Sequence, residues 1–413
     1  MHICVIGGGL TGLLAAYHLS KSHQVTVLEK RTVAGGCLSS YHLPGYAIES
    51  LYHHCFSGDT RLISLIGQLG LQDRLQWLSG STGYMVDGTI YPLTTPYQII
   101  RYPLLSIMEK IRLALFVFGS RSADLAVLDS VPAKEYIIDR LGPKVYQSFF
   151  EPLLRSKFGD KRDEVSAAWL VSRIAIRSDR GPEGERLGYL EGGFVHLVDA
   201  LVSCLADAGC RIWTNHAVSS AYATENGWVV DGERYDCVIS TLPPQETMRI
   251  CSVPLDPVPY QGAACLTLGM SADPTAGIYW VNIGDPAPYG AVITHTNLVP
   301  FERYGEHIVY IASYYSSSPP KDCEELFLSD FCRRFSIPRD AIHWHRLRIE
   351  PHAGPVYGTG YRERIADPHP MPGLFIAGMF SPENYPERSM EGSVAAGEHI
   401  AKKVMEWSFD REM

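Results

Sequence analysis

The chain has 413 residues, of which 46% are hydrophobic and 20% are charged, and its formal net charge at pH 7 is −9. A chain of this length can bury a large core and is expected to form two or three domains. Because the net charge is negative and no local basic stripe is present, nucleic acid is not an expected partner. The ten cysteines form no C-x-x-C pair, and His343 and His345 have no third ligand beside them, so we expect neither a disulfide framework nor a metal site.

The first 30 residues predict a strand, a glycine turn, a helix and a second strand. Residues 1–7, MHICVIG, are a short apolar run that ends at glycine and is typical of a buried parallel strand. Residues 10–21 have apolar side chains at helical spacing, and residues 24–30, QVTVLEK, predict the second strand. The turn between the first strand and the helix reads Gly-x-Gly-x-x-Gly, in the context that a dinucleotide-binding motif requires.

Each glycine of this turn has a predicted task. Gly7 permits the tight turn, Gly9 lets a pyrophosphate approach the backbone, and Gly12 lets the helix pack closely on the strand. The start of the helix, at Leu10 and Thr11, contributes free N–H groups and a partial positive charge for the phosphates.

The end of the second strand indicates which dinucleotide binds. Glu29, followed by Lys30, ends that strand, and its carboxylate can accept hydrogen bonds from ribose hydroxyls. The same carboxylate would repel a 2′-phosphate. The motif therefore favours FAD or NAD over NADP.

The next segment resembles a known group of flavoproteins. Residues 30–46, KRTVAGGCLSSYHLPGY, contain a Gly35-Gly36 pair that resembles the second glycine signature of glutathione-reductase-like FAD proteins. More narrowly, the pair resembles that of the amine oxidase, protoporphyrinogen oxidase and phytoene desaturase group, in which an arginine follows it. This chain has Cys37 there, and UDP-galactopyranose mutases on the same fold also lack that arginine.

Three further blocks carry the same resemblance. Residues 188–209 resemble the glycine turn and helix of the group, and residues 214–244 resemble the segment in which a valine, here Val218, holds the adenine. Residues 371–404 resemble the C-terminal flavin signature, although Met379 stands where many relatives carry an acid. No second dinucleotide motif is found. The resemblance implies FAD as the cofactor, bound by Gly7, Gly9, Leu10, Thr11, Gly12, Glu29, Lys30, Gly35, Gly36, Cys37, Val218, Gly378, Met379 and Met390.

The resemblance also predicts how the chain is organised. The fold class is α/β, with a Rossmann-like FAD-binding domain and an inserted substrate domain made of a mixed β-sheet and a helical cap. Residues 1–85, 186–250 and 345–413 are expected to build the FAD-binding domain. Residues 86–185 are expected to form the cap, and residues 251–344 the sheet, because they contain strand patterns separated by Pro, Gly and Asp turns. Residues 178–188 are interpreted as a lid hinge or a simple loop.

Four side chains are candidates for the chemistry. His53 follows the glycine pair, and because adjacent residues of a strand point to opposite faces, at most one of His53 and His54 is expected to face the pocket. His295 ends an apolar strand on the expected substrate side. Tyr385 and Arg388 lie in the loop expected to cross the flavin, where Arg388 binds a carboxylate or phosphate or braces the loop. The alternative for either histidine is an ordinary structural role.

The most apolar region is residues 97–119, which charged residues interrupt, so that it cannot be a conventional transmembrane helix. It is interpreted as a partly buried amphipathic helix, with a membrane-surface helix or the wall of a lipophilic tunnel as alternatives. Because the chain opens directly on a strand pattern, with no signal peptide visible, we expect a cytoplasmic protein, with membrane association left open.

The function predicted from these patterns is that of an FAD-dependent oxidoreductase. A hydride would pass between an apolar or amphipathic small molecule and the flavin N5 atom. A redox-neutral mutase of the UDP-galactopyranose mutase type is the first alternative, and a non-catalytic lipid carrier on the same fold is the second. No lysine can be placed near the flavin from the sequence, which argues against an O2-dependent amine oxidase.

Overall fold

A five-stranded parallel sheet is assembled from segments that are far apart in the sequence. In the computed structural model, which describes residues 1–177 and 185–412, its strand order is β19-β13-β1-β2-β9. The strands are short and apolar because both faces of the sheet are covered. They are β1 (His2–Ile6), β2 (Gln24–Leu28), β9 (Arg211–Trp213), β13 (Cys237–Ser240) and β19 (Leu374–Ile376).

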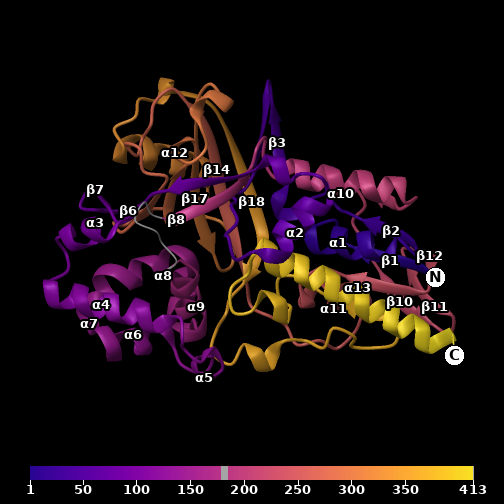
Figure 1. The fold of residues 1–413 in the computed structure, drawn as a ribbon. Helices are drawn as coiled ribbons and strands as arrows, with labels where there is room; N and C mark the ends of the chain where they lie inside the picture. Colours follow the sequence, from indigo (N-terminus) through magenta and orange to yellow (C-terminus); the bar gives the residue numbers. More distant parts are fainter. Residues whose placement is uncertain (178–184, 413) are drawn as a thin grey trace.

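Helices cover one face of this sheet, and a small antiparallel sheet covers the other (Figure 1). On β1, Ile3 and Val5 belong to the core on the helix side, whereas Cys4 and Ile6 belong to the opposite core together with Trp228. This alternation is that of a strand buried on both faces. The helices are α1 (Leu10–Leu19), α10 (Val195–Asp207) and α13 (Met390–Glu412), and the small sheet contains β10 (Ala221–Thr224), β11 (Gly227–Val230) and β12 (Glu233–Tyr235).

A second sheet has seven strands, parallel and antiparallel, in the order β18-β14-β17-β16-β15-β6-β7. All its pairings are antiparallel except that of β15 with β6. Helix α12 (Cys323–Arg334) covers one face with Phe327 and Phe331, which pack on Leu266 and Leu268. The strands are β6 (Thr82–Val86), β7 (Thr89–Pro92), β14 (Tyr260–Met270), β15 (Trp280–Ile283), β16 (Ala291–Thr294), β17 (His307–Tyr315) and β18 (Ile342–Pro355).

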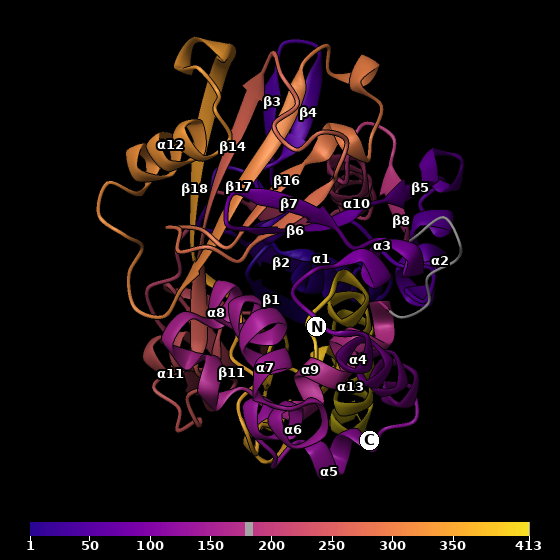
Figure 2. The ribbon, with the colours of Figure 1, turned by 90° about the vertical axis from the view of Figure 1, so that its left-hand side faces the viewer.

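A group of helices lies below this sheet in Figure 2 and forms the cap. Thr95 and Ser106 begin two of them with capping boxes, which explains why these helices start where they do. Helix α8 contacts β15 and β17, so the cap and the sheet enclose space between them. The helices are α3 (Pro96–Arg101), α4 (Ile107–Ser120), α5 (Leu125–Leu128), α6 (Ala133–Leu141), α7 (Pro143–Val145), α8 (Glu151–Phe158) and α9 (Ala167–Arg177).

The remaining elements connect these parts. The hairpin of β3 (Ser40–Leu43) and β4 (Tyr46–Glu49) follows the second glycine signature. Strands β5 (Leu75–Gly80) and β8 (Glu185–Leu190) pair antiparallel. Two further helices are α2 (Thr60–Gln68) and α11 (Pro244–Cys251).

The structure has the predicted fold class, but it moves two predicted boundaries. The break predicted after residue 85 falls inside β6, and β6 and β7 pair within the seven-stranded sheet rather than belonging to the FAD-binding domain or the cap. The break predicted after residue 344 falls inside β18, which pairs with β14 along nearly its whole length. Hydrogen bonds across a sheet set these boundaries, and composition does not report them. Of the predicted linker 178–188, residues 178–184 lie outside the described residues.

The most apolar region, residues 97–119, forms two helices, α3 and α4, rather than the single helix expected, and α4 buries few of its apolar side chains. Ile107 is 76% exposed, Leu115 is 67% exposed and Phe118 is 79% exposed. Of its apolar side chains, only Leu113 is classed as buried. Leu113, Phe116 and Val117 pack against the cap core, so α4 is partly buried as expected, and its other side exposes further apolar side chains. Within the described ranges, no helix combines the length and the apolar character needed to cross a bilayer.

Candidate functional site

One cavity of about 950 Å³ lies where the parallel sheet, the seven-stranded sheet and the cap meet. Its walls include the first glycine turn, the second glycine pair, the loop that precedes α13, and side chains from α8, α9, β14, β15 and β17. Of the fourteen residues predicted to bind FAD, all except Gly12 line it. Segments hundreds of residues apart thus converge on a single space.

The glycine turn joins β1 to α1, and its three glycines meet different constraints. Gly7 has a positive φ of 107°, which favours glycine. A Cβ on Gly12 would lie 2.0 Å from the Gly7 carbonyl oxygen, so Gly12 is required for the helix to approach the turn. Because Gly12 serves this contact, it lies behind the cavity wall rather than in it.

The fold of the protein alone does not require a glycine at position 9. Its φ of −76° and ψ of 177° suit any residue, and a Cβ built there meets nothing closer than the Gly36 Cα atom, at 3.9 Å. The space that a side chain would fill is part of the cavity, directly at the N-terminus of α1. A cradle kept open at a helix N-terminus fits a phosphate group. Gly9 therefore supports the fit of a dinucleotide to this wall.

The second glycine pair packs against the first turn. The Gly35 N–H donates to the Gly8 carbonyl oxygen at 2.7 Å, and Gly35 and Gly36 have positive φ angles of 112° and 59°. Glu29 lies beside them, where its Oε2 and Oε1 atoms accept hydrogen bonds from the N–H groups of Gly8 and Arg31, each at 2.8 Å. An ionised carboxylate has about four acceptor positions, so Glu29 can still accept from ribose hydroxyls.

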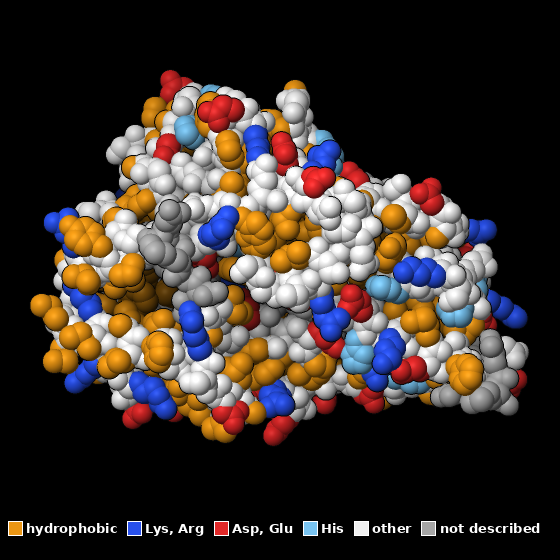
Figure 3. All heavy atoms as spheres, in the orientation of Figure 1, with side chains coloured by type: hydrophobic (Ala, Val, Ile, Leu, Met, Phe, Trp, Pro, Cys, Tyr) orange, Lys and Arg blue, Asp and Glu red, His pale blue; other side chains and the backbone are white. Residues whose placement is uncertain are grey.

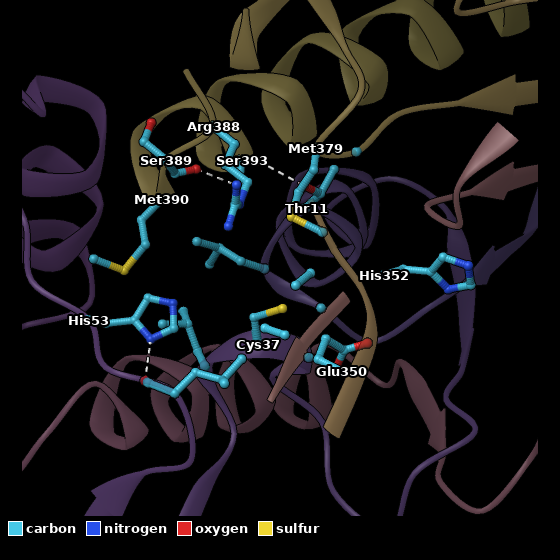
Figure 4. A pocket seen from close by; sticks show the side chains of 18 of the residues that line it. Thr11, Cys37, His53, Glu350, His352, Met379, Arg388, Ser389, Met390 and Ser393 are labelled. Carbon is cyan, nitrogen blue, oxygen red and sulfur yellow. Dashed lines mark hydrogen bonds between the residues drawn. The ribbon is translucent and has the colours of Figure 1, made fainter. Parts of the chain in front are cut away.

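The loop 378–389 is held by buried hydrogen bonds before α13 begins. Asn384, which is fully buried, donates to the Gly378 carbonyl oxygen at 3.1 Å and accepts from the Ser389 N–H at 3.0 Å. The Thr11 hydroxyl donates to the Ser393 carbonyl oxygen at 3.2 Å, which ties α1 to α13 (Figure 4). The N-termini of both helices therefore reach the same cavity, each with a partial positive charge.

Cys37 and Met379 are the two departures from the resembled pattern, and both line the cavity. Burial raises the pKa of the Cys37 thiol to about 11, so this thiol is neutral at physiological pH. Positive charge near Cys37 comes instead from Arg31 and Arg348, which both form ion pairs with Glu350. Arginines from other segments thus act electrostatically on Cys37, although none directly follows the glycine pair.

His53 lies in the cavity wall, as predicted. Its Nδ1 atom is 2.7 Å from the Leu51 carbonyl oxygen, and because a carbonyl only accepts, Nδ1 carries the proton and Nε2 is a free acceptor. Burial lowers the pKa of His53 to about 4. At most one of His53 and His54 was expected to face the pocket, but both line the cavity, because β4 ends at Glu49 and these residues follow an irregular path.

His295 does not line the cavity, so the structure gives no support to its predicted catalytic role. It is 2% exposed, its Nε2 atom lies 2.9 Å from the Tyr304 hydroxyl, and its ring packs against Tyr189 and Tyr310. A polar residue at the end of an apolar strand is therefore part of the core. Burial lowers its pKa to about 3.

The buried His295 predicts an acid-sensitive fold. Its folded-state pKa of about 3 lies below the ordinary 6.5, so the stability it contributes is present above pH 6.5 and is lost as the pH falls towards 3. When the pH is lowered from 7 to 5, we expect the free energy of unfolding of His295→Gln to fall by about 2 kcal/mol less than that of the wild type. Urea unfolding at both pH values measures this, and the exposed His42→Gln serves as the control. Equal acid losses in all three proteins would contradict it.

Tyr385 does not line the cavity either, so the structure gives no support to its predicted catalytic role. Its hydroxyl donates to the Asp129 carboxylate, and its ring stacks on Tyr361 at an interplanar angle of 7°. Asp129 directly follows α5 of the cap. Tyr385 therefore fastens the loop to the cap. Arg388, three residues later, does line the cavity and points into it from the side of α13 (Figure 4).

The cap supplies two cations to the cavity, of which sequence reasoning named Arg173 as a candidate for binding a diphosphate and missed Lys157. Lys157 on α8 and Arg173 on α9 both line the cavity, and both form ion pairs with Glu387. Their charges also lie over the Trp169 ring, at 5.3 and 5.6 Å from its centroid. The Trp169–Arg173 spacing of one helical turn was a usable signal, because it places the two side chains on one helix face.

The fold and the site define a dinucleotide-binding protein with a second domain over the cavity. The sequence profile of the family described as flavin containing amine oxidoreductase matches residues 10–405. The chain belongs to this family, and its cofactor is FAD.

Relatives and solved structures agree with this assignment. Coproporphyrinogen III oxidase from Mycobacterium tuberculosis is 23% identical over 278 residues, and the alignment covers 60% of this chain and 60% of that protein's own length. A candidate protoporphyrinogen oxidase from Exiguobacterium sp. 255-15 gives a TM-score of 0.80 at 18% identity, covering 98% of both chains. Reduced UDP-galactopyranose mutase gives 0.75 at 16% identity, covering 98% of this chain and 93% of that one. All three are similar to this chain, and the two structures show a shared fold.

Proposed function

We propose that this protein is an FAD-dependent oxidoreductase that transfers a hydride between a small organic molecule and the flavin. The observation that carries the proposal is the continuity of the cavity: it runs from the glycine turn to a region lined by the cap and the seven-stranded sheet. FAD, when bound, supplies the hydride-accepting ring. The protein's own residues then bind the substrate, orient it and exchange its proton.

His53 presents a hydrogen-bond acceptor of fixed position to this cavity. Its Nε2 lone pair is free because Nδ1 donates to Leu51, and its lowered pKa keeps the imidazole neutral at pH 7. A neutral imidazole can accept a hydrogen bond from a substrate hydroxyl or amine at this Nε2 atom and so orient the substrate. The main-chain hydrogen bond fixes the tautomer, so the acceptor atom is set before any ligand arrives.

The substrate is proposed to be apolar or amphipathic. Tyr52, Trp280 and Ala312 line the part of the cavity away from the glycine turn, and Tyr52 packs edge-on against Trp280 at 4.9 Å between ring centroids. Aromatic and small apolar side chains of this kind suit a hydrophobic ligand. The similarity to coproporphyrinogen III oxidases supports an oxidation of such a molecule.

An absorbance spectrum of the purified protein tests this function. Peaks near ~370 and ~450 nm, which bleach on anaerobic reduction, are expected for an oxidised flavin bound to the protein. Rapid recovery of the absorbance in air would favour an oxidase, and slow recovery a dehydrogenase or a mutase. A colourless protein that cannot be reconstituted with FAD would contradict the proposal and favour the carrier alternative.

One specific observation supports the mutase alternative. Arg173 and Arg388, which are 215 positions apart in the sequence, line the same cavity, as a site for a sugar diphosphate would need. A reduced, FAD-loaded protein that interconverts isomers without net electron transfer would establish this second function. Stoichiometric reduction of the flavin by a substrate would exclude it as the main activity.

The exposed face of α4 is proposed to contact a membrane surface. Ile107, Leu115 and Phe118 point outward at one- and two-turn spacing, and hydrophobic side chains gather over the cap in Figure 3. Lys110 and Arg112 lie on the same helix, although the whole chain is acidic. An exposed apolar stripe with basic residues beside it suits an anionic lipid surface.

Vesicle binding tests this contact. We expect the double variant Leu115→Ser/Phe118→Ser to bind anionic vesicles about tenfold or more weakly than the wild type in a flotation assay, because each side chain loses its apolar burial in lipid. Leu326→Ser/Phe301→Ser removes exposed apolar groups elsewhere and should bind as the wild type does. Equal binding by all three proteins, or none by the wild type, would reject the membrane contact.

A further inference from the structure

Three cationic side chains converge on the part of the cavity formed by the cap and the loop before α13. Lys157 comes from α8, Arg173 from α9 and Arg388 from the loop. Lys157 Nζ and Arg173 Nη1 lie 3.3 and 2.9 Å from the same Oε1 atom of Glu387. Among residues 1–177 and 185–412, Glu387 is the only carboxylate within ion-pair distance of any of the three cations. The cluster therefore keeps an excess of positive charge.

The excess does not depend on Lys157 being protonated, because the guanidinium groups of Arg173 and Arg388 alone outnumber the Glu387 carboxylate. Burial lowers the pKa of Lys157 well below its ordinary value, and the neighbouring Arg173 lowers it further. Burial would raise the pKa of Glu387, but Lys157 and Arg173 outweigh it, so the pKa lies below its ordinary value. A surplus of positive charge acts in this direction on both groups. A bound anion would compensate it.

The tyrosines beside Arg388 add hydrogen-bond donors to the same region. Arg388 Nη2 lies 3.4 Å from the Tyr314 hydroxyl, and that hydroxyl lies 3.1 Å from the Tyr52 hydroxyl. Because a guanidinium only donates, Tyr314 accepts from Arg388 and can donate to Tyr52, whose own hydrogen is then available to a ligand. The cation centres of Lys157 and Arg388 lie 5.8 and 5.7 Å from the centroid of the Tyr314 ring.

We propose that Lys157, Arg173 and Arg388 form a subsite for an anionic oxygen group, a carboxylate or a phosphate, carried by the substrate. This assignment rests on the proposed oxidoreductase function, since it identifies the polar end of that enzyme's substrate. The phosphates of FAD would be held elsewhere, by the Gly9 turn and the N-terminus of α1. With Trp280 in the same cavity, the substrate class is an amphipathic organic acid or phosphate ester.

Calorimetry on the FAD-loaded protein tests the subsite with three probes of one shape: benzoate, phenyl phosphate and the neutral benzyl alcohol. At least one anion is expected to bind, and benzyl alcohol at least tenfold more weakly. Arg173→Gln is expected to weaken anion binding about tenfold or more, because it removes a charge-assisted donor. The tighter of the two anions tells whether the group is a carboxylate or a phosphate.

The matched control removes an arginine from the same cap but outside the cavity. Arg140→Gln, on the exposed side of α6, should change anion binding by less than twofold. The FAD content of Arg173→Gln should equal that of the wild type, because loss of FAD would place this arginine at the cofactor and overturn the proposal. Equal binding of the neutral probe, or unchanged anion binding in Arg173→Gln, would also overturn it. If the protein takes up no FAD, the oxidoreductase function fails, and the same titration of the apoprotein still tests the subsite.

Discussion

Replacing Gly9 with alanine is expected to abolish tight FAD binding while leaving the apoprotein as stable as the wild type. The new Cβ has room in the protein, where its nearest neighbour would be the Gly36 Cα atom at 3.9 Å, but it occupies the wall that faces the pyrophosphate. We expect FAD affinity to fall about 100-fold or more, because the helix N-terminus and its N–H groups can no longer be approached. Apoprotein stability should change by less than about 1 kcal/mol.

Gly12→Ala provides the contrasting result for this prediction. Its Cβ would lie 2.0 Å from the Gly7 carbonyl oxygen, so α1 must move away from β1, and both stability and FAD binding should fall. Gly119→Ala, in the exposed part of α4, meets nothing within 4 Å and should stabilise the protein slightly. Urea unfolding of each apoprotein and fluorescence titration with FAD separate the effects. An unstable Gly9→Ala apoprotein, or one with normal FAD affinity, would contradict our account of Gly9.

The nucleotide end of the site could be predicted from the sequence because its constraints are local. Gly7, Gly9 and Gly12 lie within six residues, and the spacing alone reports the turn, the close approach and the helix contact. Glu29 follows in the next strand of the same unit. Where a backbone conformation or a short spacing carries the information, the sequence is sufficient.

The reactive end could not be predicted in the same way, because its partners meet only in the folded chain. Lys157 and Glu387 are 230 positions apart, and neither residue alone indicates an ion pair in a cavity. The place of His295 could not be predicted either, because a polar residue at a strand end gives the same pattern whether it faces a substrate or a buried hydroxyl such as that of Tyr304. Sheet pairing likewise placed β6 beside β15, far away in sequence.

Replacing Glu387 with glutamine is expected to destabilise the protein by about 3 kcal/mol or more at pH 7. The substitution keeps the shape of the side chain but leaves the Lys157 ammonium and the Arg173 guanidinium without their shared carboxylate, in a place where side-chain exposure is only 13% and 27%. Removing one partner of a buried ion pair leaves the remaining charge uncompensated, which costs more than the pair itself contributes. Urea unfolding of the two FAD-loaded proteins measures the difference.

The pH dependence of that difference identifies its cause. The pKa of Glu387 lies below its ordinary 4.5 in the folded state, so the stability it contributes is present above pH 4.5 and is lost as the pH falls through the folded-state pKa. The wild type and Glu387→Gln should therefore converge in acid. Glu398→Gln, which removes a surface partner of Arg61 on α13, should cost less than about 1 kcal/mol. If the difference in free energy of unfolding between the wild type and Glu387→Gln were the same at every pH, Glu387 would stabilise the fold by packing. The cation cluster would then not depend on the charge of Glu387.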